Sequence, residues 1–294
     1  MWGDIAIAFL LAFITAFVIT PYSIRWAKKV GAVDYPNDRR VNKKPMPRLG
    51  GIAVIAGFLV SAIYLIITMR IENNIDFITD GLGKKLLGFL FGAMVLGITC
   101  YIDDVKGISP LVKLAGQLIA AIIVVSCGVR IDNFTIPFKE NSIMINEVIS
   151  YILTIGWIVG ITNAINLIDG LDGLSSGITL IACISMLIIF SLNESPLIAI
   201  ILITALAGAI VGFLPYNFNP AKTFIGDVGS NFMGYAISII SILGVAKTYT
   251  AIVIIAPIIV LALPIFDTLW AIVRRIVKTK SIKGVFKADK GHLA

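Results

Sequence analysis

Long apolar runs separated by short polar segments recur along the whole chain. A helix needs about 20 apolar residues to cross the hydrocarbon core of a membrane, and nine runs approach or reach that length. They predict transmembrane helices at roughly 4–23, 50–69, 86–102, 111–128, 148–165, 173–192, 196–214, 231–246 and 249–272. We therefore expect an all-α polytopic membrane protein that forms a single transmembrane domain over residues 1–294.

One segment departs from the helical pattern. Residues 129–146 alternate apolar and polar side chains on both sides of a turn between Pro137 and Ser142. Alternation of this kind around a turn predicts a short β-hairpin.

The composition agrees with a membrane protein. Hydrophobic residues make up 58% of the chain and charged residues 14%, with a mean hydropathy of +0.98. Soluble domains are about half apolar and a quarter charged. The first run precedes its positive charges, so we interpret it as a retained helix and not as a cleaved signal peptide. Cys100, Cys127 and Cys183 lie far apart in apolar stretches and are assigned no chemistry.

The distribution of positive charge predicts an orientation. A net charge of +7 could suggest nucleic-acid binding, but the basic residues flank apolar runs, as residues that control topology do. With the N-terminus outside, the predicted inner loops hold 18 of the 24 lysines and arginines. We expect a multi-pass membrane protein with the hairpin outside and the C-terminus in the cytoplasm.

The acidic residues of the polar motifs at the helix ends all fall on the predicted cytoplasmic side. They are Asp103, Asp104, Asp169, Asp172, Asp227 and, beside the only histidine, His292, also Asp289. Secondary transporters place such residues near the bilayer midplane. Their position at the inner helix ends therefore favours an enzyme over a transporter, which stays a remote alternative.

Asp103 and Asp104 end the third predicted helix. They could cap the helix, but two carboxylates at a helix C-terminus oppose its dipole. A metal ion or a basic partner is the better explanation. Carboxylate oxygens are typical ligands of Mg²⁺, which often bridges them to substrate phosphates.

Asn163, Asn166, Asp169 and Asp172 recur every third residue in NAINLIDGLDGL. Neighbouring members of such a series lie side by side on a helix. The alternative is a polar loop between two helices, which does not explain the regular spacing of the apolar residues. We favour a ligand site.

The segment YNFNPAKTFIGDVGS carries Asn217, Phe224 and Asp227 before a helix start near Ser230. Amides at a helix start can face an anion, although Asn, Pro and Gly also form plain turns. Three basic side chains could bind phosphate, namely Lys44, Arg48 and Lys113. Alternatively, they are positive charges that set the membrane topology.

Five motifs in order carry a family resemblance: DYPNDRRVNKKPMPRLGG, IDDVKGISPLVKLAGQ, NAINLIDGLDGLSSG, NPAKTFIGDVGS and ADKGHL. The chain resembles the polyprenyl-phosphate N-acetylhexosamine-1-phosphate transferases. PMPRLGG and DKGHL are similar to the branch that starts wall teichoic acid, O-antigen and related glycans. The peptidoglycan branch, the phospho-N-acetylmuramoyl-pentapeptide transferases, has a GTPTMGG-like first motif and is the main alternative.

The resemblance implies a reaction. Family members move a sugar 1-phosphate, here N-acetylglucosamine 1-phosphate, from a UDP-sugar to undecaprenyl phosphate and release UMP. Mg²⁺ is the implied cofactor, with Mn²⁺ as a substitute, and a homodimer is a further candidate assembly. The family continues through more histidines and at least one further helix after the position of Ala294. We therefore expect a C-terminally truncated chain, which leaves an inactive scaffold as another alternative.

The resemblance also implies residue roles. The catalytic residues would be Asp103, Asp104, Asp227 and His292, and the metal ligands Asp227, Asp169 and Asp103. Substrate contacts would come from Lys44, Lys113, Asn163, Asn166, Asp169, Asp172, Asn217 and Phe224, with Phe224 stacking on uracil. A phosphate monoester is largely ionised at pH 7, because its second pKa is about 6. We therefore favour direct attack of the lipid phosphate on the UDP-sugar over a covalent aspartate intermediate.

Overall fold

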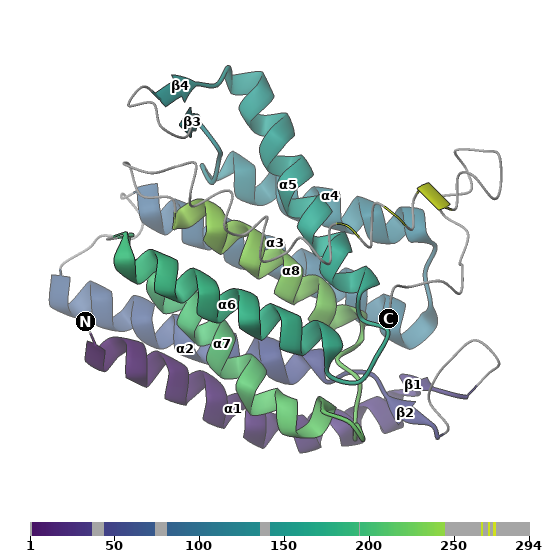
Figure 1. Ribbon diagram of the computed structural model, residues 1–294. Helices are drawn as coiled ribbons and strands as arrows, with labels where there is room; N and C mark the ends of the chain where they lie inside the picture. The colour runs from purple at the N-terminus through teal and green to yellow at the C-terminus, as the bar shows by residue number, and fades with distance from the viewer. Residues whose placement is uncertain are drawn as a thin grey trace.

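The computed structural model describes residues 2–36, 44–73, 81–135, 142–193 and 195–244, together with residues 266, 270, 273 and 274. Within these residues the chain forms eight α-helices and two short antiparallel ladders (Figure 1). The helices are α1 (Trp2–Val30), α2 (Gly51–Asn73), α3 (Gly81–Lys106), α4 (Pro110–Ser126), α5 (Glu147–Leu167), α6 (Leu174–Leu192), α7 (Leu197–Asn217) and α8 (Gly226–Leu243). The strands are β1 (Val33–Asp34), β2 (Met46–Pro47), β3 (Asn133–Thr135) and β4 (Ser142–Met144).

Each of the first eight predicted apolar runs coincides with a helix within the described residues. Three boundaries differ by five residues or more from the prediction. Helix α1 continues to Val30, past the predicted end at 23. Helices α3 and α8 begin five residues early, at Gly81 and Gly226 in place of 86 and 231. The predicted ninth helix, 249–272, lies almost entirely outside the described residues.

Five of the described helices are long and apolar enough to cross a membrane, and the chain is a membrane-embedded protein. These spans are Gly3–Val30, Gly81–Lys106, Glu147–Leu167, Leu174–Leu192 and Leu197–Asn217. Shorter apolar stretches lie in α2 and α4. The total of nine spans and the side of each terminus stay predictions.

The two ladders lie toward opposite ends of the helix bundle (Figure 1). Strands β3 and β4 pair within the segment predicted as a hairpin, with Phe134 opposite Ile143. Strands β1 and β2 pair Val33 with Pro47 and were not predicted. Each has two residues, which is too short to display an alternating pattern.

Helix α7 forms the centre of the bundle and packs against α1, α2 and α6, while α8 packs against α3 and α5. Close helix contact depends on small residues, as is usual inside membranes. A Cβ atom at Gly212 of α7 would collide with the carbonyl oxygen of Phe13 in α1. The sequence of α7 thus suits a helix surrounded by other helices.

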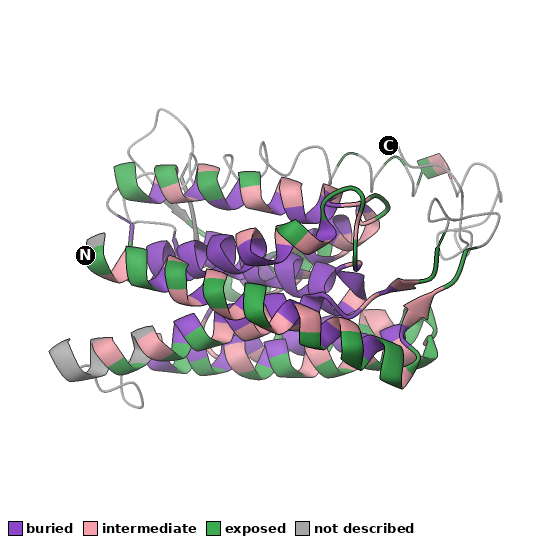
Figure 2. Cartoon of the chain, turned by 90° about the horizontal axis from the view of Figure 1, so that it is seen from below, coloured by how far each residue is buried: buried purple, intermediate pink, exposed green. Residues whose placement is uncertain are grey.

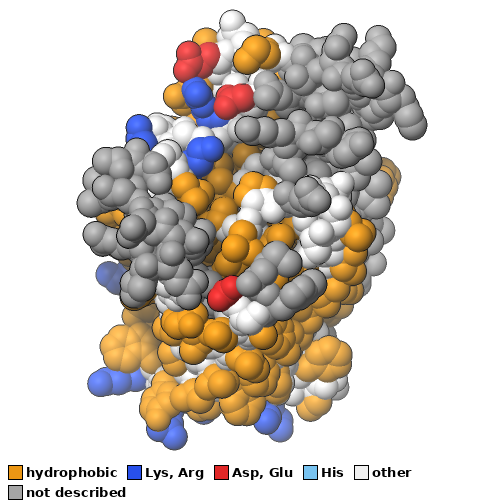
Figure 3. Space-filling view, turned by 90° about the vertical axis from the view of Figure 1, so that its left-hand side faces the viewer, with side chains coloured by type: hydrophobic (Ala, Val, Ile, Leu, Met, Phe, Trp, Pro, Cys, Tyr) orange, Lys and Arg blue, Asp and Glu red, His pale blue; other side chains and the backbone are white. Residues whose placement is uncertain are grey.

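Large apolar side chains also cover the outside of the bundle. Leu10 of α1, Phe91 of α3 and Ile181 of α6 are 52%, 54% and 62% exposed. Buried residues fill the interior while exposed positions line the outer helix faces (Figure 2). At the end of the bundle seen in Figure 3, hydrophobic side chains cover much of the described surface. This arrangement suits a lipid environment, because water would disfavour so much exposed apolar area.

Candidate active site

The ends of several helices meet at the end of the bundle that carries β1 and β2. The backbone joins them: Phe224 N donates to Pro47 O at 2.8 Å, and Gly51 N donates to Ile225 O at 2.8 Å. These bonds hold the segment before α8 against β2 and the start of α2. The acidic and amide side chains of α3, α5 and α8 are thereby brought to one region.

Lys113, one turn into α4, links three other helices. Its Nζ lies 2.5 Å from Asp227 Oδ1, 3.0 Å from Asn166 Oδ1 and 3.4 Å from Asp103 Oδ2. Ser109 caps α4 and Pro110 begins it, which places Lys113 one turn after the α3–α4 connection. We call these four side chains the Lys113 cluster. They are only partly buried, so a ligand can reach them.

Asn166 orients the carboxylate of Asp227. Its Nδ2 donates to Asp227 Oδ1 at 2.6 Å and to Ser230 Oγ at 2.9 Å. The same side chain accepts from Lys113, so its two polar ends bind opposite charges. On the other side of the cluster, Asp103 Oδ1 accepts from Ile108 N at 2.9 Å. The positions of both carboxylates are therefore held by neighbouring donors.

Asp104 differs from its neighbour Asp103. Its side chain is 1% exposed and accepts two backbone bonds from the first turn of α8, from Asp227 N at 3.1 Å and Val228 N at 2.9 Å. Helix α8 has no side-chain cap of its own. An anion at a helix N-terminus satisfies free amides and opposes the positive end of the dipole. Asp104 therefore caps α8 and positions the backbone of Asp227.

We expect Asp104→Asn to destabilise the protein. The carboxamide offers only one oxygen to the two α8 amides, and its NH₂ group adds a buried donor that faces other donors. An unsatisfied buried polar group costs about 1–3 kcal/mol. The measurement is the thermal unfolding midpoint in detergent. Asp103→Asn is the matched control and should leave the midpoint near the native value, whereas an unchanged midpoint for Asp104→Asn would contradict the capping role.

Arg48 caps the C-terminal end of α3. Its Nη2 donates to Asp104 O at 2.7 Å and to Asp103 O at 3.3 Å, and its Nε donates to Asp104 O at 2.9 Å. An ion pair of 3.2 Å joins Nη1 to Asp34 Oδ1. The last carbonyls of a helix lack intrahelical donors. Arg48 supplies donors to α3 and connects it to β1, which is a different role from the phosphate binding considered for it.

Asp169 and Asp172 hold the loops beside the cluster. Ser175 Oγ donates to Asp169 Oδ1 at 2.6 Å, and Ala221 N donates to Asp172 Oδ2 at 3.0 Å. Burial raises the pKa of Asp169 to about 7, against the lowering effect of the Ser175 hydrogen bond. Asp172 thus ties the loop after α5 to the loop before α8.

Asn217 and Phe224 flank the loop between α7 and α8. Asn217 is buried and accepts from Ser176 Oγ at 2.9 Å, while its Nδ2 donates to Thr223 O at 3.1 Å. The backbone of Phe224 is bonded to Pro47 and Gly50, and its side chain is partly buried. Asn217 therefore shapes the loop that presents Phe224.

A buried amide network lies one turn below the cluster. Gln117 Nε2 donates to Asn231 Oδ1 at 2.7 Å, and Asn163 Nδ2 donates to Gln117 Oε1 at 2.7 Å. Asn231 Nδ2 also donates to Asp227 O at 2.8 Å. The structure therefore places Asn163 among supporting amides and separates it from Asn166.

Of the residues that the sequence nominates, the structure brings Asp103, Lys113, Asn166 and Asp227 into one cluster. Lys44 is exposed, before β2, and His292 lies outside the described residues. Sequence reasoning missed several polar partners: Gln117, Ser175, Ser176, Ser230 and Asn231. A helical spacing of four from Lys113 to Gln117, and from Asp227 to Asn231, is the signal that could have found two of them.

The oxygens around Lys113 Nζ suit a hard cation. Two carboxylates and one carboxamide oxygen converge on its positive charge. Within the described part of the chain, no group of three or more acidic, histidine or cysteine side chains is arranged to hold a metal ion. Mg²⁺ often takes one or two carboxylates and completes its shell with water and phosphate oxygens. Asp103 and Asp227, with Asn166, fit such an ion.

Comparisons with known proteins reveal clear relatives. The model of glycosyl transferase family 4 matches residues 86–245, which contain the whole Lys113 cluster. The chain is 43% identical over 293 residues to the "Probable undecaprenyl-phosphate N-acetylglucosaminyl 1-phosphate transferase" of Bacillus subtilis (strain 168). That alignment covers 98% of this chain and 76% of the relative.

Two further relatives are more distant. A "Decaprenyl-phosphate N-acetylglucosaminephosphotransferase" of Mycobacterium tuberculosis is 34% identical over 306 residues, covering 96% of this chain and 72% of the relative. A "Phospho-N-acetylmuramoyl-pentapeptide-transferase" of Staphylococcus epidermidis is also 34% identical, over 251 residues. Its alignment covers 81% of this chain and 74% of the relative. The chain thus resembles enzymes of both branches over most of its length.

Proposed function

The chain belongs to glycosyl transferase family 4, and we propose that the Lys113 cluster is the reaction centre of an N-acetylglucosamine-1-phosphate transferase. The protein is a membrane enzyme that transfers a sugar 1-phosphate to a prenyl phosphate in cell-wall synthesis. The proposed donor is UDP-N-acetylglucosamine and the proposed acceptor is undecaprenyl phosphate. The product would start a teichoic acid or another surface polysaccharide.

The proposed reaction is a single displacement at phosphorus. An oxygen of the acceptor phosphate attacks the phosphorus that carries the sugar, and a new P–O bond forms. The P–O bond to the uridine-bearing phosphate breaks, and UMP leaves with the electron pair. Because the acceptor phosphate is largely ionised at pH 7, positioning and charge neutralisation matter more than proton removal.

The contacts of Lys113 carry this proposal. Its Nζ lies against carboxylates of two helices and an amide oxygen of a third, in a partly buried region. The ammonium group can exchange a carboxylate contact for a substrate phosphate oxygen and neutralise charge as UMP leaves. Asp103, Asn166 and Asp227 would hold Mg²⁺, which supplies Lewis-acid neutralisation of the diphosphate when bound.

We place the nucleotide beside the Lys113 cluster, over the loops after α5 and before α8. Asp172 joins these loops through Ala221 N, and Asn217 holds the loop that carries Phe224. Stacking of Phe224 on uracil remains part of the proposal. A UDP-sugar is a cytoplasmic compound, so we place this end of the bundle at the cytoplasmic face of the plasma membrane.

The proposed metal predicts a dependence on divalent cations. Chelation with EDTA should abolish UMP release, and Mg²⁺ should restore it, with Mn²⁺ as a weaker or equal substitute. The reason is that the two carboxylates and the diphosphate repel one another without an ion between them. UMP is measured by chromatography after each addition. Full activity in EDTA would contradict the role given to Asp103 and Asp227.

The alternative donor is the peptide-bearing UDP-sugar of peptidoglycan synthesis. The similarity to the Staphylococcus epidermidis enzyme supports it, whereas the higher identity to the Bacillus subtilis relative and the PMPRLGG motif favour UDP-N-acetylglucosamine. A panel of UDP-sugars with undecaprenyl phosphate separates the two. UMP release only from UDP-N-acetylmuramoyl-pentapeptide would overturn our assignment.

A further inference from the structure

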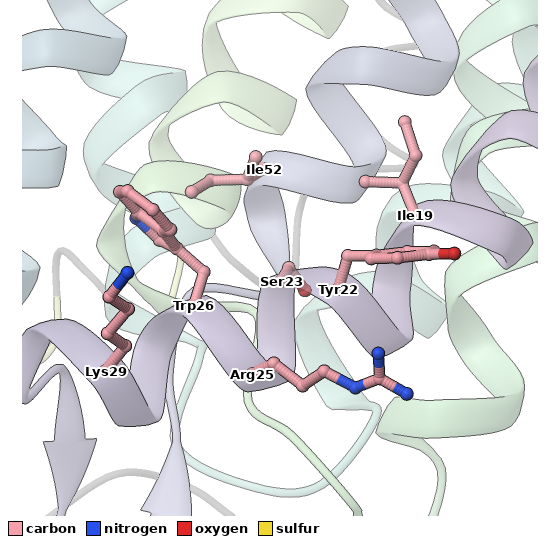
Figure 4. Close-up of a pocket in the computed structure, with 7 residues that line it drawn as sticks. All are labelled: Ile19, Tyr22, Ser23, Arg25, Trp26, Lys29 and Ile52. Atoms are coloured by element: carbon pink, nitrogen blue, oxygen red, sulfur yellow. The ribbon is translucent and has the colours of Figure 1, made fainter.

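A cleft on α1 lies apart from the Lys113 cluster. Its volume is about 420 Å³, within the range of roughly 300–1,000 Å³ that is usual for small-molecule sites. It is lined by Ile19, Tyr22, Ser23, Arg25, Trp26 and Lys29 of α1 and by Ile52 of α2 (Figure 4). We call it the α1 cleft. None of its lining residues belongs to the Lys113 cluster, so the proposed reaction gives it no role.

The α1 cleft combines aromatic rings with two cations. Side chains three or four residues apart share one face of a helix, and this spacing places two ring–cation pairs along the cleft, Arg25 with Tyr22 and Lys29 with Trp26 (Figure 4). The guanidinium carbon of Arg25 lies 5.5 Å from the centre of the Tyr22 ring, and Lys29 Nζ lies 6.0 Å from that of Trp26. Cation–π contacts of this kind hold the charges over the rings.

The charges of the α1 cleft are not neutralised by described acids. No carboxylate in the described ranges forms an ion pair with Arg25 or Lys29. The wall beside them is apolar, with Ile19 on α1 and Ile52 on α2 (Figure 4). A ligand that complements both features carries an anionic group next to a hydrocarbon chain.

The composition of the cleft suits the membrane–water interface. Tryptophan and tyrosine concentrate at that level, and basic residues near it attract anionic lipid headgroups. Trp26 Nε1 donates to the hydroxyl of Tyr101 at 3.1 Å, which positions the indole between α1 and α3. We propose that the α1 cleft binds one anionic glycerophospholipid, with its phosphodiester at Lys29 beside Trp26 and its chains along Ile19 and Ile52. Arg25, beside Tyr22, adds positive charge at the other end of the cleft.

A bulk phospholipid fits the α1 cleft better than the prenyl phosphate substrate. The phosphate of the acceptor has to reach the side chains of Lys113 and Asp227, and neither lines the cleft. An acceptor phosphate held in the α1 cleft would therefore be withheld from the reaction. We infer a bound lipid that stabilises the α1–α2–α3 contact.

Fluorescence of Trp26 provides the test. The full-length protein is placed in phosphatidylcholine vesicles that contain brominated phosphatidylglycerol or, at equal mole fraction, brominated phosphatidylcholine. The signal of Trp26 is the native fluorescence minus that of Trp26→Phe, because the chain has four tryptophans. We expect brominated phosphatidylglycerol to quench this signal more strongly than brominated phosphatidylcholine.

Charge variants show whether the cleft itself selects the lipid. Each basic side chain near an anionic surface contributes roughly 1 kcal/mol, and about 1.4 kcal/mol is a factor of ten. Arg25→Gln with Lys29→Gln should therefore lower the preference for phosphatidylglycerol about thirtyfold. The matched control, Lys28→Gln with Lys106→Gln, removes two exposed charges outside the cleft and should retain the preference. Thermal unfolding of both variants checks that they are folded.

Three results would overturn the proposal. Equal quenching by the two brominated lipids would show that the cleft does not select charge. An equal loss of preference in the control variant would mean diffuse attraction to the surface only. Removal of the quenching by equimolar undecaprenyl phosphate would assign the cleft to the substrate. These measurements do not involve UMP release, so their outcome does not depend on whether the proposed reaction is correct.

Discussion

We expect Asp227→Asn to lower the rate of UMP release by about 10²–10³-fold, the loss that follows removal of one strong electrostatic contact from an active site. The carboxylate receives hydrogen bonds from Lys113 and Asn166 on one oxygen. An amide at this position carries no charge and would also bring a second NH₂ group toward these donors. Release of UMP from UDP-N-acetylglucosamine and undecaprenyl phosphate measures the effect.

Asp132→Asn is the matched control for that substitution. Asp132 also accepts a side-chain hydrogen bond, from Ser150 Oγ at 3.0 Å, but it lies in the segment next to β3. We expect its variant to keep native activity. A native rate in Asp227→Asn, or an equal loss in Asp132→Asn, would remove Asp227 from the reaction centre.

Lys113→Met should reduce UMP release by a similar factor of about 10²–10³. The methionine keeps a comparable volume but leaves Asp103 and Asp227 without the cation that contacts both. Like charges at short range repel, and the phosphates of the substrate would add to this repulsion. The measurement is the rate of UMP release at saturating substrate.

Two comparisons sharpen the Lys113 result. Lys106→Met removes an exposed lysine at the end of α3 and should leave the rate near native. Lys113→Arg retains a positive charge but changes the position of the donors, so an intermediate rate is expected. Activity within about a factor of two of native in Lys113→Met, far below the loss expected of an electrostatic residue, would contradict our interpretation.

Hydrophobic runs predicted most of the described fold, because each helix that enters lipid has to be apolar over most of its length. They failed at the start of α8. The polar turn from Asp227 to Asn231 is helical because Asp104, from α3, caps it. A cap supplied by another helix leaves no local signal in the sequence, so the predicted start at 231 came too late.

The candidate site was predicted in part for a similar reason. Its acids could be assigned to one side of the membrane from charge counts alone, and the structure places Asp103 and Asp227 against the same lysine. The different roles of Asp103 and Asp104 could not be predicted. Adjacent residues on a helix point about 100° apart, so one faces the cluster and the other faces α8.

The role of Arg48 shows why the functions of individual basic residues could not be predicted from the sequence. In the sequence it is one of several cations in the first loop, and all of them agree with the positive-inside rule. Its contacts with the carbonyls of Asp103 and Asp104 depend on where the end of α3 lies in space. The structure is therefore needed to distinguish Arg48, which caps a helix, from the other basic residues of the first loop.

The path of the phosphorus atom tests the proposed reaction most directly. UDP-N-acetylglucosamine is labelled with ³²P in the phosphate that carries the sugar, and the protein is supplied with undecaprenyl phosphate and Mg²⁺. We expect the label to move into the lipid fraction together with the sugar, unlabelled UMP to be released, and the transfer to fail in Asp227→Asn. Label that stays in a released nucleotide, or transfer that persists in Asp227→Asn, would contradict the assignment of the Lys113 cluster as a sugar-1-phosphate transferase centre.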